Sequence, residues 1–161
     1  MMRRALIVLG LVAVLGLVAW EVMQKERLLA TGETVVLGLA PLDPRSLIQG
    51  DYMRLEFAIA RRWPQDDSWP RDGVLIIAPD RFGVAEFRRL DRGEPLASGE
   101  HRLTYRIRKG RLQLGTNAWY FQEGTAASWQ AARYGEFRVA SDGTALLVRL
   151  LDAELRPMGT R

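Results

Sequence analysis

The sequence has 161 residues, of which 48% are hydrophobic and 26% are charged, and its formal net charge is +4 at pH 7. This length allows one ordinary domain with an appendage, and the composition excludes a collagen, a coiled coil and a wholly disordered chain. Because there is no cysteine and His101 is the single histidine, disulfides, thiolate catalysis, iron–sulfur clusters and cysteine-based or all-histidine metal sites are excluded too. We expect no cofactor and no bound metal.

The positive charge does not predict a nucleic-acid partner. All of the 23 basic residues except Lys25 and Lys109 are arginines, and they are scattered along the chain. Nucleic-acid binding favours a basic stripe interleaved with aromatic platforms. The densest set of arginines, within residues 102–111, instead alternates along a strand-like run, which is typical of a solvated sheet face.

The first predicted element is a membrane helix over residues 5–23. No charged residue occurs from residue 5 through Trp20. The whole segment 5–23 has 19 residues and would form about 28 Å of helix, enough to cross the hydrocarbon core of a bilayer. Arg3 and Arg4 precede the run and should stay in the cytoplasm, while Trp20 suits the opposite interface. We therefore expect residues 1–4 inside and the C-terminal bulk outside.

Two other interpretations of this run are disfavoured. A cleaved signal peptide fits the charged start and the apolar stretch equally well, but it needs a cleavage site with small residues. Residues 17–19 form a poor site, because the bulky Trp20 and the acidic Glu21 follow directly. A buried core helix is disfavoured because no polar face interrupts the run. We therefore expect an uncleaved anchor.

Beyond the anchor, the chain predicts a juxtamembrane helix or linker over residues 24–33 and a mainly β domain over residues 34–161. Short apolar runs separated by turn residues predict strands at 34–39, 51–59, 74–78, 84–90, 101–108, 111–114, 119–122, 134–140 and 144–151. The expected fold class is α+β, with an N-terminal transmembrane helix followed by a mainly antiparallel β domain that contains one short helix.

Turn and helix signals place the connections of this domain. Lys109 and Gly110 should form a type I′ hairpin turn, and residues 141–143 a three-residue hairpin loop that ends in glycine. The alanine-rich stretch 125–133 predicts the short helix, with Thr125 as a candidate N-cap.

The run 51–59 shows the clearest alternation in the chain. Its apolar residues are Met53, Leu55, Phe57 and Ile59, and its polar face carries Tyr52, Arg54 and Glu56. Such alternation is typical of a strand that is buried on one face. We expect Leu55 and Phe57 to be fully buried, and Arg54 and Glu56 not to be.

The segment around this strand resembles a known family. Gly50, Asp51, Tyr52 and Leu55 match the signature of the bacterial GDYXXLXY proteins, whereas Phe57 stands where that signature has tyrosine. The stretches 121–139 and 146–157 also resemble that family, so the resemblance covers nearly the whole chain. It implies a small protein anchored in the bacterial inner membrane with its domain in the periplasm, close to larger polytopic membrane proteins. It supplies no catalytic residues.

The candidate binding site gathers polar residues near this signature and near the predicted helix: Asp43, Arg45, Gly50, Asp51, Tyr52, Gln122 and Glu123. As a functional cluster, they would bind a cation, a peptide backbone or a protein partner. As a structural cluster, an Arg45 ion pair would hold a turn and Tyr52 would pack under a loop. We expect the turn 50–52 to lie close to residues 122–124, because both join a strand to a turn with small and acidic residues.

These patterns predict a non-enzymatic, membrane-anchored accessory or interaction domain that works with a larger membrane protein, with the lipid bilayer as its other partner. The alternative is an enzyme with an unrecognised carboxylate–tyrosine site. A degenerate hydrolase is a further alternative, because the spacing of residues 44–51 resembles the catalytic box of type I signal peptidases. However, Leu42 stands at the position of the nucleophile, Ser46 falls on another position, and Lys109 in a solvated turn is a poor base.

Overall fold

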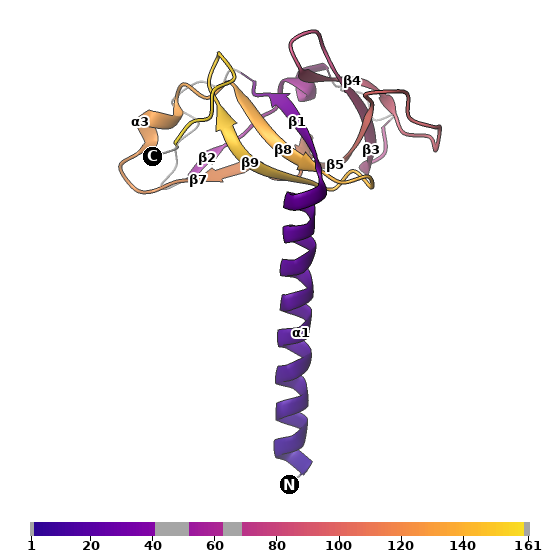
Figure 1. Cartoon of the computed structure of the whole chain (residues 1–161), viewed down its shortest axis with the longest axis vertical. Helices are drawn as coiled ribbons and strands as arrows, with labels where there is room; N and C mark the ends of the chain where they lie inside the picture. Colours follow the sequence, from indigo (N-terminus) through magenta and orange to yellow (C-terminus); the bar gives the residue numbers. More distant parts are fainter. Residues whose placement is uncertain (1, 41–51, 63–68, 160–161) are drawn as a thin grey trace.

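The computed structural model of the protein describes residues 2–40, 52–62 and 69–159. A long apolar helix is followed by a mainly antiparallel β domain with one short α-helix, so the expected α+β class is confirmed (Figure 1). The elements are α1 (Met2–Thr31), β1 (Glu33–Gly38), β2 (Tyr52–Arg54), the 3₁₀ helix η1 (Ala58–Arg62), β3 (Asp72–Pro79), β4 (Val84–Leu90), β5 (His101–Arg108), β6 (Arg111–Leu114), β7 (Ala118–Tyr120), α3 (Ala126–Trp129), β8 (Tyr134–Val139) and β9 (Ala145–Leu151).

The strands form one large sheet and one short ribbon. The seven-stranded sheet has the order β6-β5-β3-β4-β1-β8-β9, and β2 pairs with β7 in a separate two-stranded ribbon. Within the large sheet, β1 runs parallel to β4, and the other neighbouring strands run antiparallel. In Figure 1 this sheet curves, with β8 and β9 on one side of β1 and β3, β4 and β5 on the other. We call this β domain the head.

The curved sheet encloses one apolar core. Its inward positions follow the strand period of two, as in β8, where Gly135, Phe137 and Val139 are buried and the residues between them are half-buried. Phe137 packs edge-on against Phe57 at 5.7 Å between ring centroids. The core therefore joins β8 to the segment that follows β2.

The strand predicted over residues 51–59 is shorter in the structure, although its burial pattern is confirmed. Leu55 and Phe57 are each 1% exposed, Arg54 is exposed and Glu56 is half-buried. The ribbon strand β2 ends at Arg54, and Phe57 forms an isolated bridge with Leu39. The chain then turns into η1, so Ile59 reaches the core from a 3₁₀ helix instead of from a strand.

The helix predicted over residues 125–133 is also shorter, since α3 has only four residues. Thr125 makes no side-chain cap to this helix; its Oγ1 instead donates to the carbonyl of Gln122 at 2.6 Å. Trp129 then holds the turn by packing on Trp119, and the amide of Ala132 bonds to the carbonyl of Trp129 at 3.1 Å. Aromatic packing and local turns therefore replace a longer α-helix here.

The predicted hairpins occur where expected. Lys109 and Gly110 have φ values of 52° and 70°, as a type I′ turn requires, and Gly143 has a φ of 90° in the β8–β9 turn. The strand predicted at 74–78 begins earlier, because Asp72 and Gly73 also pair with β5.

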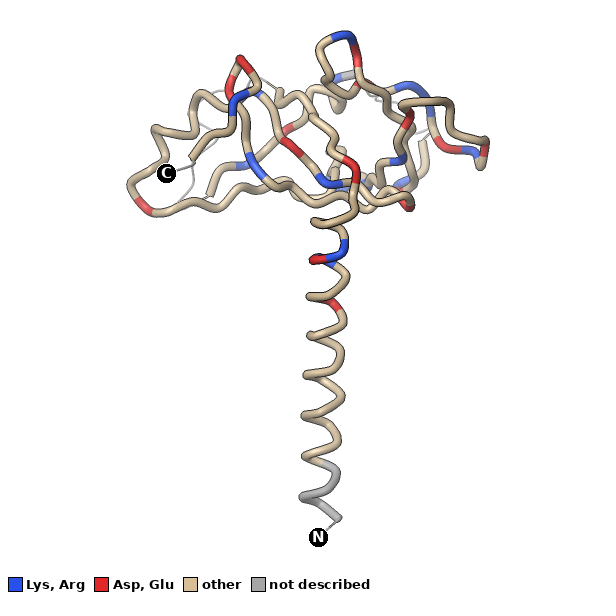
Figure 2. Tube along the Cα trace, in the orientation of Figure 1, with Lys and Arg blue, Asp and Glu red and all other residues tan. Residues whose placement is uncertain are grey.

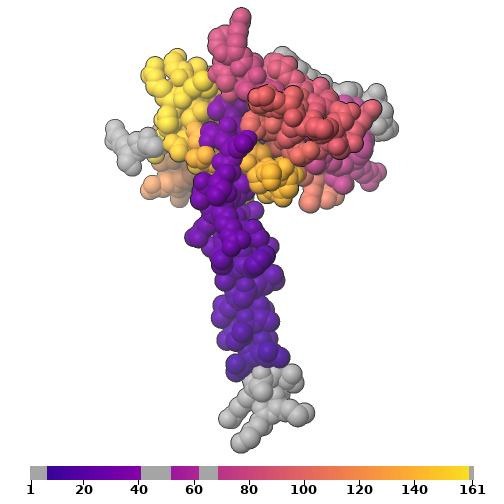
Figure 3. All heavy atoms as spheres, turned by 45° about the vertical axis from the view of Figure 1, so that its right-hand side comes forward, coloured from indigo at the N-terminus to yellow at the C-terminus, as the bar shows by residue number. Residues whose placement is uncertain are grey.

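The membrane-compatible helix joins the head directly. The segment Ile7–Thr31 is long and apolar enough to cross a membrane. Only Gly32 separates α1 from β1, and its amide bonds to the carbonyl of Leu28 at 2.9 Å. Leu28 is 7% exposed against the head, and Arg138 Nη1 on β8 donates to the Gly32 carbonyl at 3.1 Å and to Thr34 Oγ1 at 2.7 Å. The helix projects from the head as a rod (Figure 3).

Candidate functional site

The ribbon of β2 and β7 brings the family signature against a second aromatic strand. Tyr52 pairs with Tyr120, and Met53 with Trp119. The rings of Tyr52 and Tyr120 lie 5.7 Å apart with a tilt of 39°. Because cross-strand neighbours share one face of a ribbon, both phenols lie on the face opposite Met53, which is buried. Tyr120 is 75% exposed, so this face presents an aromatic pair to the surroundings.

An aromatic cluster supports the other face of the ribbon. Trp119 contacts Trp129 edge-on at 5.4 Å, and Trp129 stacks on Phe121 at 6.5 Å between ring centroids. The indole Nε1 of Trp129 donates to Thr125 Oγ1 at 3.4 Å, whereas Trp119 Nε1 is buried with no hydrogen-bond partner. A shallow cavity of about 350 Å³ beside the two indoles is lined by Trp119, Trp129, Val148, Arg149, Met158 and Gly159.

The structure places three of the seven predicted site residues. Tyr52 lies in the ribbon, while Gln122 and Glu123 are exposed in the turn that follows β7, two and three residues after Tyr120. The other four predicted residues lie outside the described residues: Asp43, Arg45, Gly50 and Asp51. Leu42 and Ser46 of the hydrolase alternative also lie outside them. The expected closeness of turn 50–52 to residues 122–124 stays a prediction, and the pairing of Tyr52 with Tyr120 is consistent with it.

Sequence reasoning missed the partner tyrosine. Residues 119–122 were expected to form a strand, but nothing local indicated that Tyr120 would pair with Tyr52 across 68 positions of the chain. The available signal was the run of three aromatic residues, Trp119, Tyr120 and Phe121, in a chain with only 9% aromatic residues. Such a cluster next to a turn indicates a packed or partner-facing surface.

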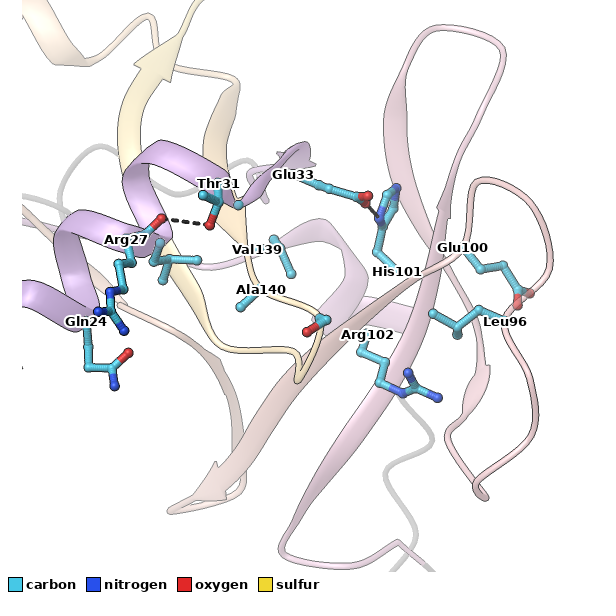
Figure 4. A pocket seen from close by; sticks show the side chains of 13 residues that line it. Gln24, Arg27, Thr31, Glu33, Leu96, Glu100, His101, Arg102, Val139 and Ala140 are labelled. Atoms are coloured by element: carbon cyan, nitrogen blue, oxygen red, sulfur yellow. Dashed lines mark hydrogen bonds and ion pairs between the residues drawn. The ribbon is translucent and has the colours of Figure 1, made fainter.

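A second concave region lies where α1 meets the head. This groove has a volume of about 450 Å³ and is lined by the last two turns of α1, the loop and strand around residues 96–102, and the β8–β9 turn (Figure 4). Across it, His101 Nδ1 lies 2.5 Å from Glu33 Oε2. His101 is half-buried at the start of β5. We call this region the junction groove.

Ion pairs fasten the loop beside the junction groove. Hydrogen bonds from the Arg102 guanidinium and from the Gly93 amide lower the pKa of Asp91, and Arg102 Nε lies 2.7 Å from Asp91 Oδ2. A hydrogen bond from Arg89, with one from the Ala97 amide, likewise lowers the pKa of Glu100. The ion pairs that cause these shifts join loop 91–100 to β4 and β5 and favour the ionised form of both carboxylates, so the shifts have a structural cause.

No catalytic arrangement emerges from the part of the chain that the structure describes. Within residues 2–40, 52–62 and 69–159, no group of three His, Asp or Glu side chains could hold a metal ion. Burial raises the pKa of Tyr105, whose hydroxyl bonds to the carbonyl of Pro70 at 3.2 Å inside the core. Lys109, the base of the hydrolase alternative, lies at the tip of the β5–β6 hairpin, where it is exposed.

Comparison with known proteins gives a family. The family model for the GDYXXLXY protein matches residues 14–150, from the middle of α1 to the last strand. No curated protein and no solved structure gives a significant match to the chain.

Proposed function

Since the chain belongs to the GDYXXLXY protein family, we propose that it is a non-enzymatic accessory domain, anchored in the bacterial inner membrane by α1, that binds a larger membrane protein. The N-terminus lies in the cytoplasm and the head in the periplasm. Arg3 and Arg4 before the apolar segment support this orientation, because basic residues favour the cytoplasmic side.

The single observation that carries this proposal is the stiff junction between α1 and the head. Gly32 is the only residue between helix and strand, and Leu28 and Arg138 fix its surroundings. A head on a flexible linker could sweep a wide volume, whereas a head joined to its anchor by a single residue would stay at one height above the bilayer. Its partners must therefore present a surface close to the membrane, as the exposed loops of a polytopic protein do.

The tyrosine pair on the ribbon is the surface best suited to such a contact. Exposed tyrosines provide large rigid contact areas with a polar tip, and they are enriched among the residues that dominate binding energy. In Figure 1 the ribbon lies at the lower margin of the head, at the level where α1 ends. With α1 spanning the bilayer, this level would bring the pair of Tyr52 and Tyr120 close to the membrane surface, where a neighbouring membrane protein could meet it.

Site-specific crosslinking in native membranes tests this contact. A photo-reactive phenylalanine analogue at Tyr120 should yield a discrete crosslinked product with a membrane protein. Phe82 is the matched control, because it is an exposed aromatic in the β3–β4 turn, which lies at the top of the head in Figure 1. Equal products from both positions, or none from either, would contradict the proposed surface.

A fusion experiment tests the orientation separately. Alkaline phosphatase is active only outside the cytoplasm, so a fusion after Gly32 should be active, and the intact mass should include Met1 or Met2. A mature N-terminus near Ala19 would show that the helix is a cleaved signal sequence and would overturn the anchor.

A further inference from the structure

We propose that the junction groove binds the phosphodiester headgroup of a membrane phospholipid. This inference rests on the membrane anchoring proposed above, and it does not depend on any protein partner. The groove is a different surface from the tyrosine pair: it is a concave, polar region where helix, strand and turn meet.

The groove combines residues from three parts of the chain. Gln24, Arg27 and Thr31 form its wall on α1, and His101 and Arg102 form the facing wall at the start of β5. Figure 4 shows these two walls with Val139, at the end of β8, and Ala140, which follows it, between them. The groove is therefore rich in hydrogen-bond donors of the guanidinium, amide and hydroxyl classes, which suit phosphate oxygens.

Most acidic side chains around the groove contact a neighbouring donor, and one guanidinium has no acidic partner among the described residues. Glu33 pairs with His101, Glu100 with Arg89, and Asp91 with Arg102. Among the residues that the structure describes, no acidic side chain pairs with the exposed guanidinium of Arg27.

Arg102 adds further hydrogen-bond donors to the groove. It bonds Asp91 through Nε at 2.7 Å, and among the residues described its two terminal amino groups have no acidic partner. The groove thus offers guanidinium N–H groups that no described acidic side chain occupies, and such groups suit the oxygens of an anionic ligand.

The height of the groove matches the headgroup layer. Gln24 directly follows the apolar segment 5–23, and Thr31 lies about 10 Å further along the helix axis at 1.5 Å per residue. The headgroup layer on each side of the hydrocarbon core is about 5–8 Å thick. In Figure 2, the charged residues on the coloured part of α1 lie toward the head, where this layer would be. Phosphates would therefore surround Arg27 at high local concentration.

One helix face connects the groove to the acyl-chain region. Leu17, Trp20, Gln24, Arg27 and Thr31 are spaced three or four residues apart, so they lie in one row on α1. Leu17 is 64% exposed and Trp20 is 57% exposed. A lipid with its phosphate at Arg27 can lay an acyl chain along Leu17, with the Trp20 ring at the interface between them. This continuity favours a phospholipid over a free soluble anion.

Lipid titration of the full chain tests the proposal. The protein is purified in a maltoside detergent, which carries no phosphate, and titrated with phosphatidylglycerol while native mass spectrometry counts bound lipid. Arg27→Gln should weaken the apparent Kd about tenfold, because it removes one charge-assisted contact. Lys25→Gln is the matched control, since Lys25 is an exposed cation two residues away that does not line the groove. It should change the Kd by less than about twofold.

Three outcomes would overturn the proposal. Equal losses in Arg27→Gln and Lys25→Gln would show general surface attraction without a site. Equal binding of a diacylglycerol with the same acyl chains would show that the phosphate is not recognised. Displacement of the lipid by inorganic phosphate at matched concentration would show a soluble-anion site. If Arg27→Gln fails to fold, Gln24→Leu tests the same wall and should also weaken binding.

The result can be separated from that of the anchoring proposal. If the full chain is released from membranes by alkaline carbonate, the anchor itself is wrong. If the chain stays in the membrane but the two variants bind lipid equally, the anchor stands and only the groove assignment fails.

Discussion

The helix α1 and the head use the same apolar residue types in opposite ways. On α1, large side chains such as Leu9 and Leu17 are more than 60% exposed, whereas in the head Leu75, Leu103 and Phe137 are fully buried. Protein removes the apolar surface of the head from water, and lipid would do the same for α1 in the proposed anchored state. The difference teaches that a charge in α1 should affect where the protein resides, while a truncated side chain in the head should affect whether it folds.

The largest expected effect is the loss of the central aromatic contact in the head. Phe137→Ala removes a fully buried ring that packs on Phe57, so it should lower the free energy of unfolding by about 3–5 kcal/mol. Phe82→Ala is the matched control, because Phe82 is 64% exposed, and it should change stability by less than about 0.5 kcal/mol. Urea unfolding of both variants measures this, and similar losses would show that the core is misplaced.

A second truncation tests the segment after β2. Leu55→Ala should cost about 2–5 kcal/mol of unfolding free energy, since Leu55 is almost completely buried, whereas Arg54→Ala should be close to neutral. The pair differs by one position along an alternating run, so it tests the direction of each side chain. A loss below about 1 kcal/mol for Leu55→Ala, measured by the same urea titration, would show that the direction is wrong.

A charge in the middle of α1 should act on the other region. Leu11→Arg places a cation near the centre of the apolar segment, which costs about 2.5–3.5 kcal/mol for insertion. Membrane fractionation should show a smaller inserted share, while near-ultraviolet circular dichroism of the head stays unchanged. Leu29→Arg, on the same helix but beyond the apolar segment, is the control and should insert normally. Loss of head structure in Leu11→Arg would break the comparison.

The boundary between the regions depends on Arg138. Its Nη1 donates to the Gly32 carbonyl and to Thr34 Oγ1, so Arg138→Gln should loosen the junction at a cost of about 1 kcal/mol in a partly exposed setting. Hydrogen exchange at residues 32–34 should become faster, and exchange in β3 should not. Unchanged exchange at the junction would show that Leu28 packing alone holds it.

The smallest expected effect depends on pH and is confined to the head. The pKa values of Asp91 and Glu100 are lowered in the folded protein, by hydrogen bonds from Arg102 and Arg89. Their contribution to stability is therefore fully present above their unfolded pKa values near 4, and it is lost as pH falls through the lower folded values. Thermal unfolding of the head should show a declining Tm below about pH 4, and the Asp91→Asn, Glu100→Gln double variant should show a flatter profile there. An identical profile would assign the acid sensitivity to other carboxylates.

Local patterns in the sequence determined much of this fold. The alternation around Leu55 predicted its burial, and the dipeptide at Lys109 predicted a type I′ turn, because both effects act within a few residues. The helix predicted at 125–133 is present but shorter, because Trp129 packs on Trp119 of β7, and such a tertiary contact overrides helix propensity. Four of the seven predicted site residues lie outside the described residues.

The tyrosine pair on the ribbon and the junction groove both depend on contacts between segments that are distant in the sequence, which no local pattern contains. Tyr120 belongs to an aromatic pair only because Tyr52 lies opposite it in the ribbon, and Arg27 belongs to a groove only because Arg102 lies on the facing wall. A sequence pattern with a period of two or 3.6 residues describes one element at a time, so it identifies the faces of these elements but not which faces meet. The resemblance of residues 50–55 to the family signature located one half of the ribbon and left its partner strand unassigned.

Because a single glycine separates α1 from β1, the number of residues in α1 determines the rotational orientation of the head about the helix axis. Each residue of an α-helix advances about 100° around the axis and 1.5 Å along it. One residue added before Gly32 would thus turn the tyrosine pair by roughly a quarter of a revolution or slightly more, while four added residues would nearly restore its direction about 6 Å higher. In the proposed anchored state, a helix that packs against α1 within the bilayer would therefore also determine which way the head faces, because the short junction would transmit a rotation of α1 to the head.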